Sequence, residues 1–428
     1  MTDSANEHHE LLTHILLLFV FVRGKYSLSN LCYNLPMQKL YETKEKTQRA
    51  FLVSILNGNS GDEAMCRELE GLASTLELEI AAHEKIRVRE KSAKFGMGSG
   101  KAEELSKKAG EIGADLLVFD WNPSPSQQRN WEELSGLPAL DRQELIIRIF
   151  SQRAITREAE LQVKLAQLNF FLPRLTHKYI DLSRQRGGRY GTKGAGETKL
   201  ETDRRKIEKQ INQLEKEIEQ VGKQRKTQRS MRERNNLPVC AIVGYTNAGK
   251  SSLLNVLTGA QVLAEDKLFC TLDAVTRRFQ PAPGVTVLLT DTVGFIRALP
   301  HSLIKAFRST LEEAALADIL IHILDASDPD VENNYETTIN VLTELSQKKD
   351  KNEKERKNKN TEDQEEKPSL DIPMITVLNK IDRLPDSAVE ELQNRFPNSI
   401  AVSIKEKKGL DALKEKIAET VTNKIAGH

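Results

Sequence analysis

The sequence predicts an α/β protein in which two parallel sheets are separated by a purely helical segment. Apolar runs of strand length alternate with helical patterns over residues 51–134 and again over 239–421, as is typical of parallel α/β domains. Between these two regions, apolar residues recur at spacings of three and four, which is the period of one helix face. The 428 residues carry a net charge of +1, so any attraction to nucleic acid must come from a local basic surface.

The first sheet is predicted within an N-terminal α/β domain at residues 46–150. In chain order we expect a strand at Phe51–Leu56, a helix ending near Leu76, a helix at Lys101–Ile112, a strand at Leu116–Phe119 and a helix at Gln127–Leu134. The run Gly98-Ser99-Gly100-Lys101 resembles half a phosphate loop but lacks its spacing. We therefore expect a glycine turn before a helix there, with a nucleotide-binding role as the alternative.

Residues 1–45 are expected to be a disordered leader or, with Met37 as the true first residue, a mis-assigned translation start. The apolar run Leu11–Val22 is too short to span a membrane, and the acidic stretch before it is unlike the basic start of a signal peptide. No membrane role is expected. The four cysteines are scattered without metal-ligand spacing, which favours a reducing cytoplasm.

Residues 151–235 are predicted to form an antiparallel helical hairpin. Each of two helices has one apolar seam, made by Leu161, Leu165, Leu168, Leu172 and Leu175 and by Ile207, Ile211, Leu214, Ile218 and Val221. A short non-helical stretch joins them, so the two seams can pack against each other. The alternative is two ordinary helices packed on the neighbouring domain.

The stretch that joins the two helices is rich in glycine and positive charge. Residues 184–196 contain five glycines and four cations, and residues 184–234 contain sixteen Lys and Arg against eight Asp and Glu. This local surplus predicts a concentrated basic patch that suits an RNA backbone. A solvated charged helix with an irregular turn is the alternative.

The segment from Gly244 to Ser251 has the spacing Gly-x-x-x-x-Gly-Lys-Ser of a phosphate loop. It lies between an expected strand, Val239–Val243, and an expected helix, Ser252–Leu257, as this motif requires. The loop turns backbone N–H groups toward a phosphate at a helix N-terminus. A chance glycine-rich turn would not have the strand and helix in place. The residues expected to bind the phosphates are Gly244, Tyr245, Thr246, Asn247, Ala248, Gly249, Lys250, Ser251 and Ser252.

Asn379-Lys380-x-Asp382 indicates which base is bound. The Asp382 carboxylate can accept two hydrogen bonds from the N1–H and amine of guanine, whereas adenine has no such pair of donors. Asn379 and Lys380 are expected to brace the loops around it.

The segment Asp291-x-x-Gly294 supplies a carboxylate on the magnesium side of the nucleotide and a backbone N–H for the γ-phosphate. Thr271, in the preceding loop, is the expected second hydroxyl for Mg²⁺. The sequence thus predicts a Mg²⁺-dependent GTPase, with catalytic roles for Lys250, Thr271 and Gly294. Nucleotide contacts are expected from Asp291, Thr292, Val293 and Gly294, and Mg²⁺ contacts from Ser251, Thr271 and Asp291, the last directly or through a water.

This GTPase domain is predicted over residues 236–424 as a Ras-like doubly wound sheet. Residues 348–367 carry no apolar side chain and are expected to be a disordered insertion. Phe295 stands after Gly294, where many small GTPases have a glutamine that orients water. We therefore expect hydrolysis to be slow until a partner binds.

Together these motifs resemble those of HflX, a family of translational GTPases. The resemblance covers roughly Gln48 to Val421, and its most specific segments are Pro125–Asn130, Gln152–Ala154, Gly194–Arg205, Phe269–Asp273 and Asp291–Phe295. Ser403-Ile404-Lys405 occupies the base-sensing loop, where Ser-Ala-Lys is usual, and these three residues are expected to contact guanine.

The resemblance implies a cytoplasmic protein that binds the large ribosomal subunit and its rRNA through the glycine-rich loop and that splits stalled or stressed ribosomes. It also implies that the N-terminal domain can bind ATP. We expect a monomer. The alternatives are a GTPase that assists assembly of the large subunit and a nucleotide-dependent RNA remodeller.

Overall fold

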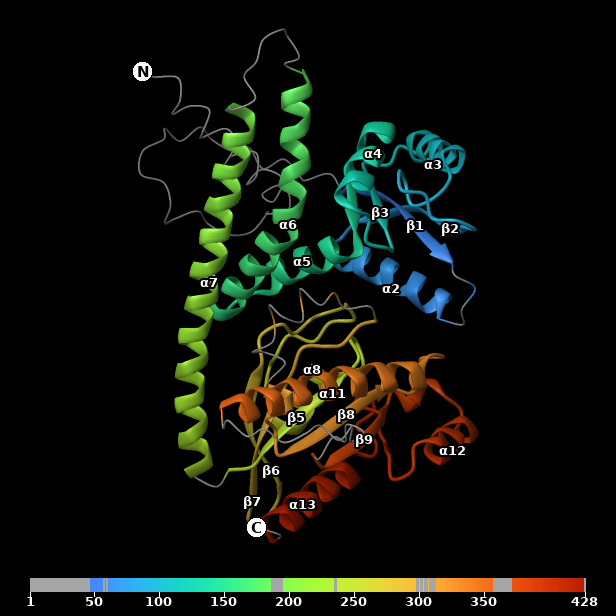
Figure 1. Ribbon diagram of the computed structural model, residues 1–428. Coiled ribbons are helices and arrows are strands. Elements are labelled where there is room, and N and C mark those ends of the chain that lie inside the picture. The colour runs from blue at the N-terminus through green and yellow to red at the C-terminus, as the bar shows by residue number, and fades with distance from the viewer. Residues whose placement is uncertain are drawn as a thin grey trace, which may run out of the picture. The chain divides into compact units, whose positions relative to one another are not determined.

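The computed structural model describes residues 47–56, 58, 61–185, 195–234, 237–297, 300, 303, 307, 313–356 and 372–426. The chain separates into two units, Met1–Thr47 and Gln48–His428, and everything below concerns the second (Figure 1). The predicted leader at 1–45, its apolar run, and the glycine-rich residues 186–194 lie outside the described residues. Within the described ranges, no helix is long and apolar enough to cross a membrane.

The N-terminal sheet is parallel, with the strand order β2-β1-β3-β4. Its strands are β1 (Arg49–Leu56), β2 (Glu79–Arg87), β3 (Leu116–Phe119) and β4 (Ala139–Asp141). Its helices are α2 (Asp62–Thr75), α3 (Ser99–Glu111), α4 (Pro125–Ser135) and α5 (Arg142–Arg153). The two predicted strands and the parallel α/β class are confirmed, whereas β2 and β4 were not predicted.

Side chains of β1 alternate between two apolar clusters, one on each face of this sheet. Phe51 and Val53 pack toward α3 and α4, together with the fully buried Trp131. Ala50 and Leu52 belong to a cluster that continues through α2 and α5 to residues of the second sheet, including Ala241. This period of two explains why β1 is apolar at each consecutive position from Ala50 to Val53.

Two long helices, α6 (Arg157–Gln185) and α7 (Ala195–Arg234), run side by side as a hairpin (Figure 1). The prediction of a helical hairpin is confirmed. We call this pair the arm. At about 1.5 Å per residue, α7 is roughly 60 Å long.

The second sheet has the strand order β10-β9-β8-β5-β7-β6 and is parallel except for β6. Its strands are β5 (Val239–Gly244), β6 (Val275–Ala282), β7 (Val285–Asp291), β8 (Ile319–Asp325), β9 (Met374–Asn379) and β10 (Ile400–Ala401). Its helices include α8 (Lys250–Thr258), α11 (Val331–Arg356), α12 (Asp386–Arg395) and α13 (Leu410–Ala426). The doubly wound class is confirmed, and the antiparallel β6 makes the sheet mixed.

The predicted disordered insertion at 348–367 differs from the structure in its first part, because α11 continues through Arg356. Residues 347–356 contain neither Gly nor Pro and consist of Gln, Lys, Asn, Asp, Glu and Arg. Opposite charges four apart, such as Asp350 and Lys354, favour the extension of a helix that has already begun. Residues 357–371 lie outside the described part of the chain.

Candidate functional site

The phosphate loop follows β5, the central strand of the second sheet, and leads into α8. Both of its glycines are required by close contacts. Gly244 has φ +151°, and a Cβ there would lie 2.2 Å from the backbone oxygen of Ile323. Gly249 has φ +103°, and a Cβ there would lie 2.4 Å from Nδ2 of Asn379. The two glycines therefore let the loop pass directly against its neighbours, as the spacing predicted.

Lys250 is the first residue of α8 and is buried. Its Nζ donates a hydrogen bond to the backbone oxygen of Tyr245 at 2.7 Å, so the side chain runs back along the inside of the loop. Burial lowers the pKa of Lys250 to about 8, and the nearby Asp291 carboxylate opposes this shift. A phosphate group in the loop would add negative charge beside this ammonium and stabilise its charged form.

Three oxygen-bearing side chains converge beside the loop. Ser251 Oγ lies 2.6 Å from Thr271 Oγ1, and each of these hydroxyls donates to Asp291 Oδ2, at 2.7 and 2.8 Å. The other carboxylate oxygen of Asp291, Oδ1, is buried and has no hydrogen-bond partner among the described residues. Burial raises the pKa of Asp291, and Lys250 is the main opposing influence. Oxygen ligands of this kind fit Mg²⁺.

The segment after β7 lies directly against the phosphate loop. The Thr246 amide donates to the Phe295 oxygen at 2.7 Å, and the Phe295 amide donates to the Gly244 oxygen at 3.1 Å. A Cβ on Gly294 would lie 2.8 Å from Thr246 Cα and 2.9 Å from Lys250 Nζ. Gly294 is thus placed where its backbone can face the γ-phosphate. Phe295 points elsewhere, since its ring is buried in the apolar core.

The residues predicted to recognise the base are held by the same loop. Asn379 donates through Nδ2 to the Ala248 oxygen at 2.9 Å, and Lys380 donates through Nζ to the Asn247 oxygen at 2.9 Å. The Ile404 amide donates back to Asn379 Oδ1 at 3.3 Å. These bonds tie the base side of the site to its phosphate side.

Asp382 follows β9 and is half-buried. The Ser403 hydroxyl donates to its Oδ1 at 2.6 Å, and this hydrogen bond lowers the pKa of Asp382. The carboxylate is therefore ionised at neutral pH and can accept hydrogen bonds from a guanine. Lys405 adds a weaker favourable charge.

The structure places the remaining predicted residues in two groups. Thr246, Asn247 and Ser252 line a pocket together with Gly249, Lys250, Ser251, Thr271 and Gly294. Thr292 and Val293 are buried behind it, and the Thr292 hydroxyl donates to the Ile242 oxygen at 2.7 Å.

Sequence reasoning missed the loop that covers this pocket. Its lining also includes Ala264, Glu265, Lys267, Phe269 and Cys270. Asp266 accepts a hydrogen bond from Asn247 Nδ2 at 2.6 Å, and Phe269 donates its amide to Thr246 Oγ1 at 2.9 Å. No motif marks Ala264, Glu265, Asp266 or Lys267. Phe269 and Cys270 belong to the Phe269–Asp273 segment of the resemblance, which gave them no role in the pocket.

Sequence reasoning also missed a polar cluster that links the phosphate loop to the N-terminal domain. The Tyr245 hydroxyl donates to Glu68 on α2 and accepts from the Arg297 amide at 2.8 Å. Glu68 also pairs with Arg142, which donates to Asp120 at 3.0 Å. Burial raises the pKa of Glu68, and Arg142 is the first of the groups that oppose the shift. Tyr245 was predicted to meet the nucleotide, yet its side chain faces the neighbouring domain.

The run Gly98–Lys101 of the N-terminal domain, which resembles half a phosphate loop, forms the start of helix α3. Gly98 is the N-cap of α3, and its φ of −61° is accessible to any residue. This agrees with a glycine turn before a helix. The prediction that this domain binds ATP stays a prediction.

The predicted basic patch of the arm is divided along its length. Residues 201–225 contain seven cations and six acids, and most of these cations pair within α7, as Arg204 does with Glu208 at 2.9 Å. The surplus lies at the two ends, with five cations and one acid in 184–200 and four cations and one acid in 226–234. A helix of the length of α7 separates these two ends by tens of ångströms, and the basic patch stays a prediction.

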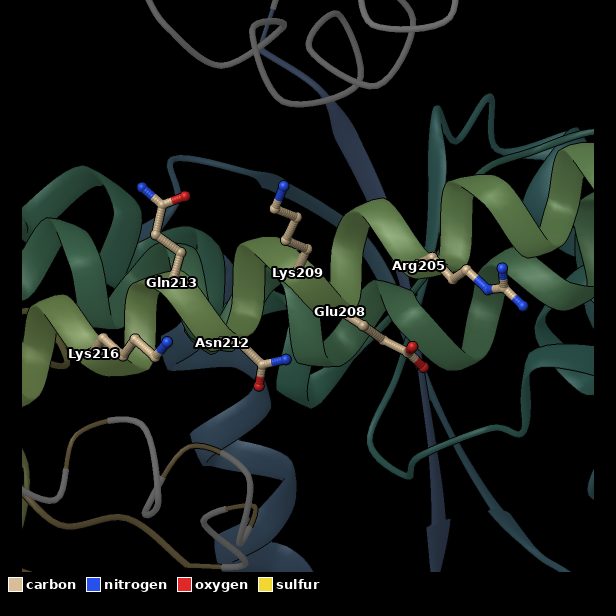
Figure 2. Close-up of a pocket in the computed structure, with 6 residues that line it drawn as sticks. All are labelled: Arg205, Glu208, Lys209, Asn212, Gln213 and Lys216. Carbon is tan, nitrogen blue, oxygen red and sulfur yellow. The ribbon is translucent and has the colours of Figure 1, made fainter.

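A shallow groove runs along the middle of α7. Figure 2 shows that its lining side chains come from successive turns of this one helix: Arg205, Glu208, Lys209, Asn212, Gln213 and Lys216. Three cations, two amides and one acid line it, so the groove is a polar surface with a small surplus of positive charge.

Hydrogen bonds join the phosphate loop to the segment predicted to recognise the base: Asn379 donates to the loop, and Ser403 donates to the Asp382 carboxylate. A phosphate-binding loop joined in this way to a guanine-specific loop defines a P-loop GTPase.

Comparison with known proteins identifies the family. The model for the "50S ribosome-binding GTPase" matches residues 239–380, the model for the "GTP-binding GTPase N-terminal" matches 63–151, and the model for the "GTP-binding GTPase Middle Region" matches 153–232. The chain belongs to the HflX family of GTPases, and it hydrolyses GTP.

Two curated relatives illustrate this membership. GTPase HflX of Akkermansia muciniphila is 43% identical over 404 residues, which cover 91% of this chain and 87% of the relative. GTPase HflX of Escherichia coli is 37% identical over 391 residues, which cover 91% of this chain and 86% of that relative. A more distant likeness is to a GTP-binding protein from Sulfolobus solfataricus solved with GDP, at 23% identity, a TM-score of 0.44, and coverage of 88% of this chain and 99% of that one.

Proposed function

We propose that this protein uses GTP to bind the large ribosomal subunit through the tip of the arm and to split stalled or stressed ribosomes. The observation that carries the proposal is the arm itself, a hairpin with a long helix α7 whose charge surplus is divided between its two ends. In the sequence, the cations of 184–200 stand next to the N-terminus of α7, at the opposite end of this helix from the start of the GTPase domain, and a cationic segment suits an RNA-lined site. The description of the family model that matches residues 239–380 supports the ribosomal subunit as the partner.

Mg²⁺ is the metal that the donor set supports. Ser251 and Thr271 offer hydroxyls and Asp291 offers a buried oxygen without a partner among the described residues. When bound, Mg²⁺ would neutralise charge on the β- and γ-phosphates. Asp291 holds both hydroxyls in position, and Lys250 contributes the remaining positive charge.

Hydrolysis should be slow until the ribosome is bound. The Phe295 ring is 1% exposed and packed in the core, so this position offers no polar group to orient the attacking water. Lys250 and the loop amides still stabilise the transition state, so activity should be low and not zero. Turnover measured with and without large subunits tests this. A group supplied in trans raises turnover by on the order of 10³–10⁵ in other GTPases, and identical rates would return Phe295 to a purely packing role.

The test of ribosome binding is sedimentation with whole ribosomes in GDP, GTP and a non-hydrolysable GTP analogue. We expect binding with the analogue and conversion of ribosomes into free subunits. Deleting residues 187–196 should weaken both and leave the intrinsic GTPase rate unchanged, since these residues join α6 to α7 in the sequence and include none of the predicted nucleotide contacts. Binding without conversion would favour a role in subunit assembly instead.

A salt series gives a sharper measurement at the tip. Replacing both Arg189 and Lys193 with serine removes two cations from the joining stretch. The magnitude of the slope of log affinity against log salt should then fall by about 1.4–1.8, since each phosphate contact contributes roughly 0.7–0.9. Lys206→Ser is the matched control, because this arm residue pairs with Asp203 at 3.4 Å. An unchanged slope in the double variant would place the RNA contact elsewhere.

A further inference from the structure

The base of the arm is built on the two segments that border the nucleotide site. Phe150, near the end of α5, packs edge-on against Phe269 with ring centroids 4.9 Å apart and against Phe307 with centroids 4.7 Å apart. Phe269 precedes Thr271 by two residues, and Phe307 follows the Gly294 segment. One aromatic ring just before the arm therefore contacts the segment that leads to Thr271 and a residue further along the chain from Gly294.

A second contact joins the same region to the start of α6. The amides of Ile155 and Thr156 donate to Asp273 Oδ2 at 3.0 and 3.2 Å, and the Thr156 hydroxyl donates to Asp273 Oδ1. The Thr156 hydroxyl also accepts from the Ala159 amide at 3.2 Å, so Thr156 is the N-cap of α6. The Asp273 carboxylate thus lies at the positive end of the helix, where negative charge is favourable.

Asp273 is two residues from Thr271, and the residue between them, Leu272, is buried in the apolar core. The Thr271 hydroxyl meets Ser251 and Asp291 in the same conformation in which Asp273 holds Thr156. The short, buried connection means that Thr271 cannot leave the site by several ångströms without pulling on Asp273. Arg153, at the end of α5, pairs with Glu265 of the same loop at 2.9 Å.

We propose that Asp273 is a positioning residue that links the arm to the nucleotide site, so that closing of Thr271 on a bound triphosphate and docking of the α6 N-terminus stabilise each other. Reciprocity requires that arm docking also favour the triphosphate over the diphosphate. The inference rests on the proposed function only in taking α6 as the base of a ribosome-binding arm.

The test is a double-mutant cycle on the full chain, without ribosomes. The affinities for GDP and for a non-hydrolysable GTP analogue are measured by calorimetry in the wild type, Asp273→Ala, Thr156→Ala and the double variant. Asp273→Ala should lower the analogue-to-GDP affinity ratio by roughly 2- to 30-fold, the range that the loss of a helix cap produces. The two single effects should not add, because both variants break the same link.

Asp411→Ala is the matched control. It removes an acidic residue from the first turn of a helix in the same domain, where the carboxylate pairs with Lys414 at 2.9 Å. Its affinity ratio should equal that of the wild type. If Asp273→Ala fails to fold, Thr156→Ala tests the link from the arm side.

Hydrogen exchange of the amides of residues 155–159 is the second readout. In the wild type these amides should exchange their hydrogens with solvent more slowly when the analogue is bound than when GDP is bound. Asp273→Ala should abolish this difference. An affinity ratio within twofold of the wild type, together with exchange that does not depend on the nucleotide, would overturn the proposal. Because no ribosome is present, this failure is distinguishable from a failure of ribosome binding.

Discussion

His322 should make the GTPase domain sensitive to acid. It lies in the middle of β8, is 0% exposed, and neither ring nitrogen has a hydrogen-bond partner among the described residues. Its ring stacks on Tyr335 with centroids 5.0 Å apart. Burial is the main cause that lowers its pKa to about 3, with a smaller contribution from the charge of Lys250.

The sign of the effect follows from the two protonation states. In the unfolded chain this histidine has a pKa of about 6.5. Between pH 6.5 and about 3, the unfolded chain binds a proton that the folded chain does not, so the free energy of unfolding falls as the pH falls through this window. Above pH 6.5 the contribution disappears. At pH 5 the loss attributable to His322 is about 2 kcal/mol.

His322→Phe keeps a ring to stack on Tyr335 and removes the titrating group. The free energy of unfolding of the variant, measured relative to that of the wild type, should be about 2 kcal/mol higher at pH 5 than at pH 7.5. For a domain of this size that corresponds to roughly 4–8 °C in the unfolding midpoint. Both proteins are heated at each pH in a calorimeter at the same GDP concentration.

Tyr335→Phe is the control for this comparison, since it changes the stacking partner and leaves the histidine in place. Its midpoint should follow that of the wild type at both pH values. If the gap between His322→Phe and the wild type is the same at pH 7.5 and pH 5, the histidine is not held neutral by burial and the reasoning fails.

Three further substitutions test the nucleotide site. Lys250→Ala should weaken GTP binding by about 2–5 kcal/mol, or roughly 30- to 5000-fold, because the phosphates lose their buried cation; direct titration measures this, and wild-type affinity would contradict it. Asp382→Asn should lower GTP affinity by at least about tenfold and raise that for XTP, because an amide is not a double acceptor; a competition assay with both nucleotides decides. Tyr245→Phe leaves the Arg297 amide and Glu68 without a shared hydroxyl, which should cost about 1–3 kcal/mol and lower the unfolding midpoint by several degrees, as thermal unfolding would show.

The parts of the fold that the sequence predicted correctly are those in which local pattern and burial agree. Leu116–Phe119 and Ile319–Leu324 are buried over their whole length, so their composition alone marks them as strands. The phosphate loop has a fixed spacing because its backbone must approach other backbone closely, at Gly244 above all.

The missed strands lie at the edges of the sheets. β2 (Glu79–Arg87) has one buried residue, Ile86, and contains five charged or titratable side chains. β6 carries Arg277 and Arg278 on an exposed edge. An edge strand needs only partial burial, so its composition resembles that of a loop and tertiary pairing decides its structure.

The contacts that sequence reasoning missed join segments that are far apart in the chain. Tyr245 and Glu68 are 177 positions apart, and Asp273 and Thr156 are 117 apart. Neither pair has a spacing or a composition that could reveal it, because each partner alone looks like an ordinary polar residue. Such contacts depend on how two folded domains pack, which a pattern along one chain does not encode.

Phe295 shows how this packing bears on catalysis. From the sequence, Phe295 indicated only that no polar side chain follows Gly294 to orient a water. In the structure its ring belongs to the same apolar cluster as Phe150 and Leu303, while its backbone bonds to the phosphate loop on both sides. The position of the Gly294 amide is therefore fixed partly by a core shared with the N-terminal domain.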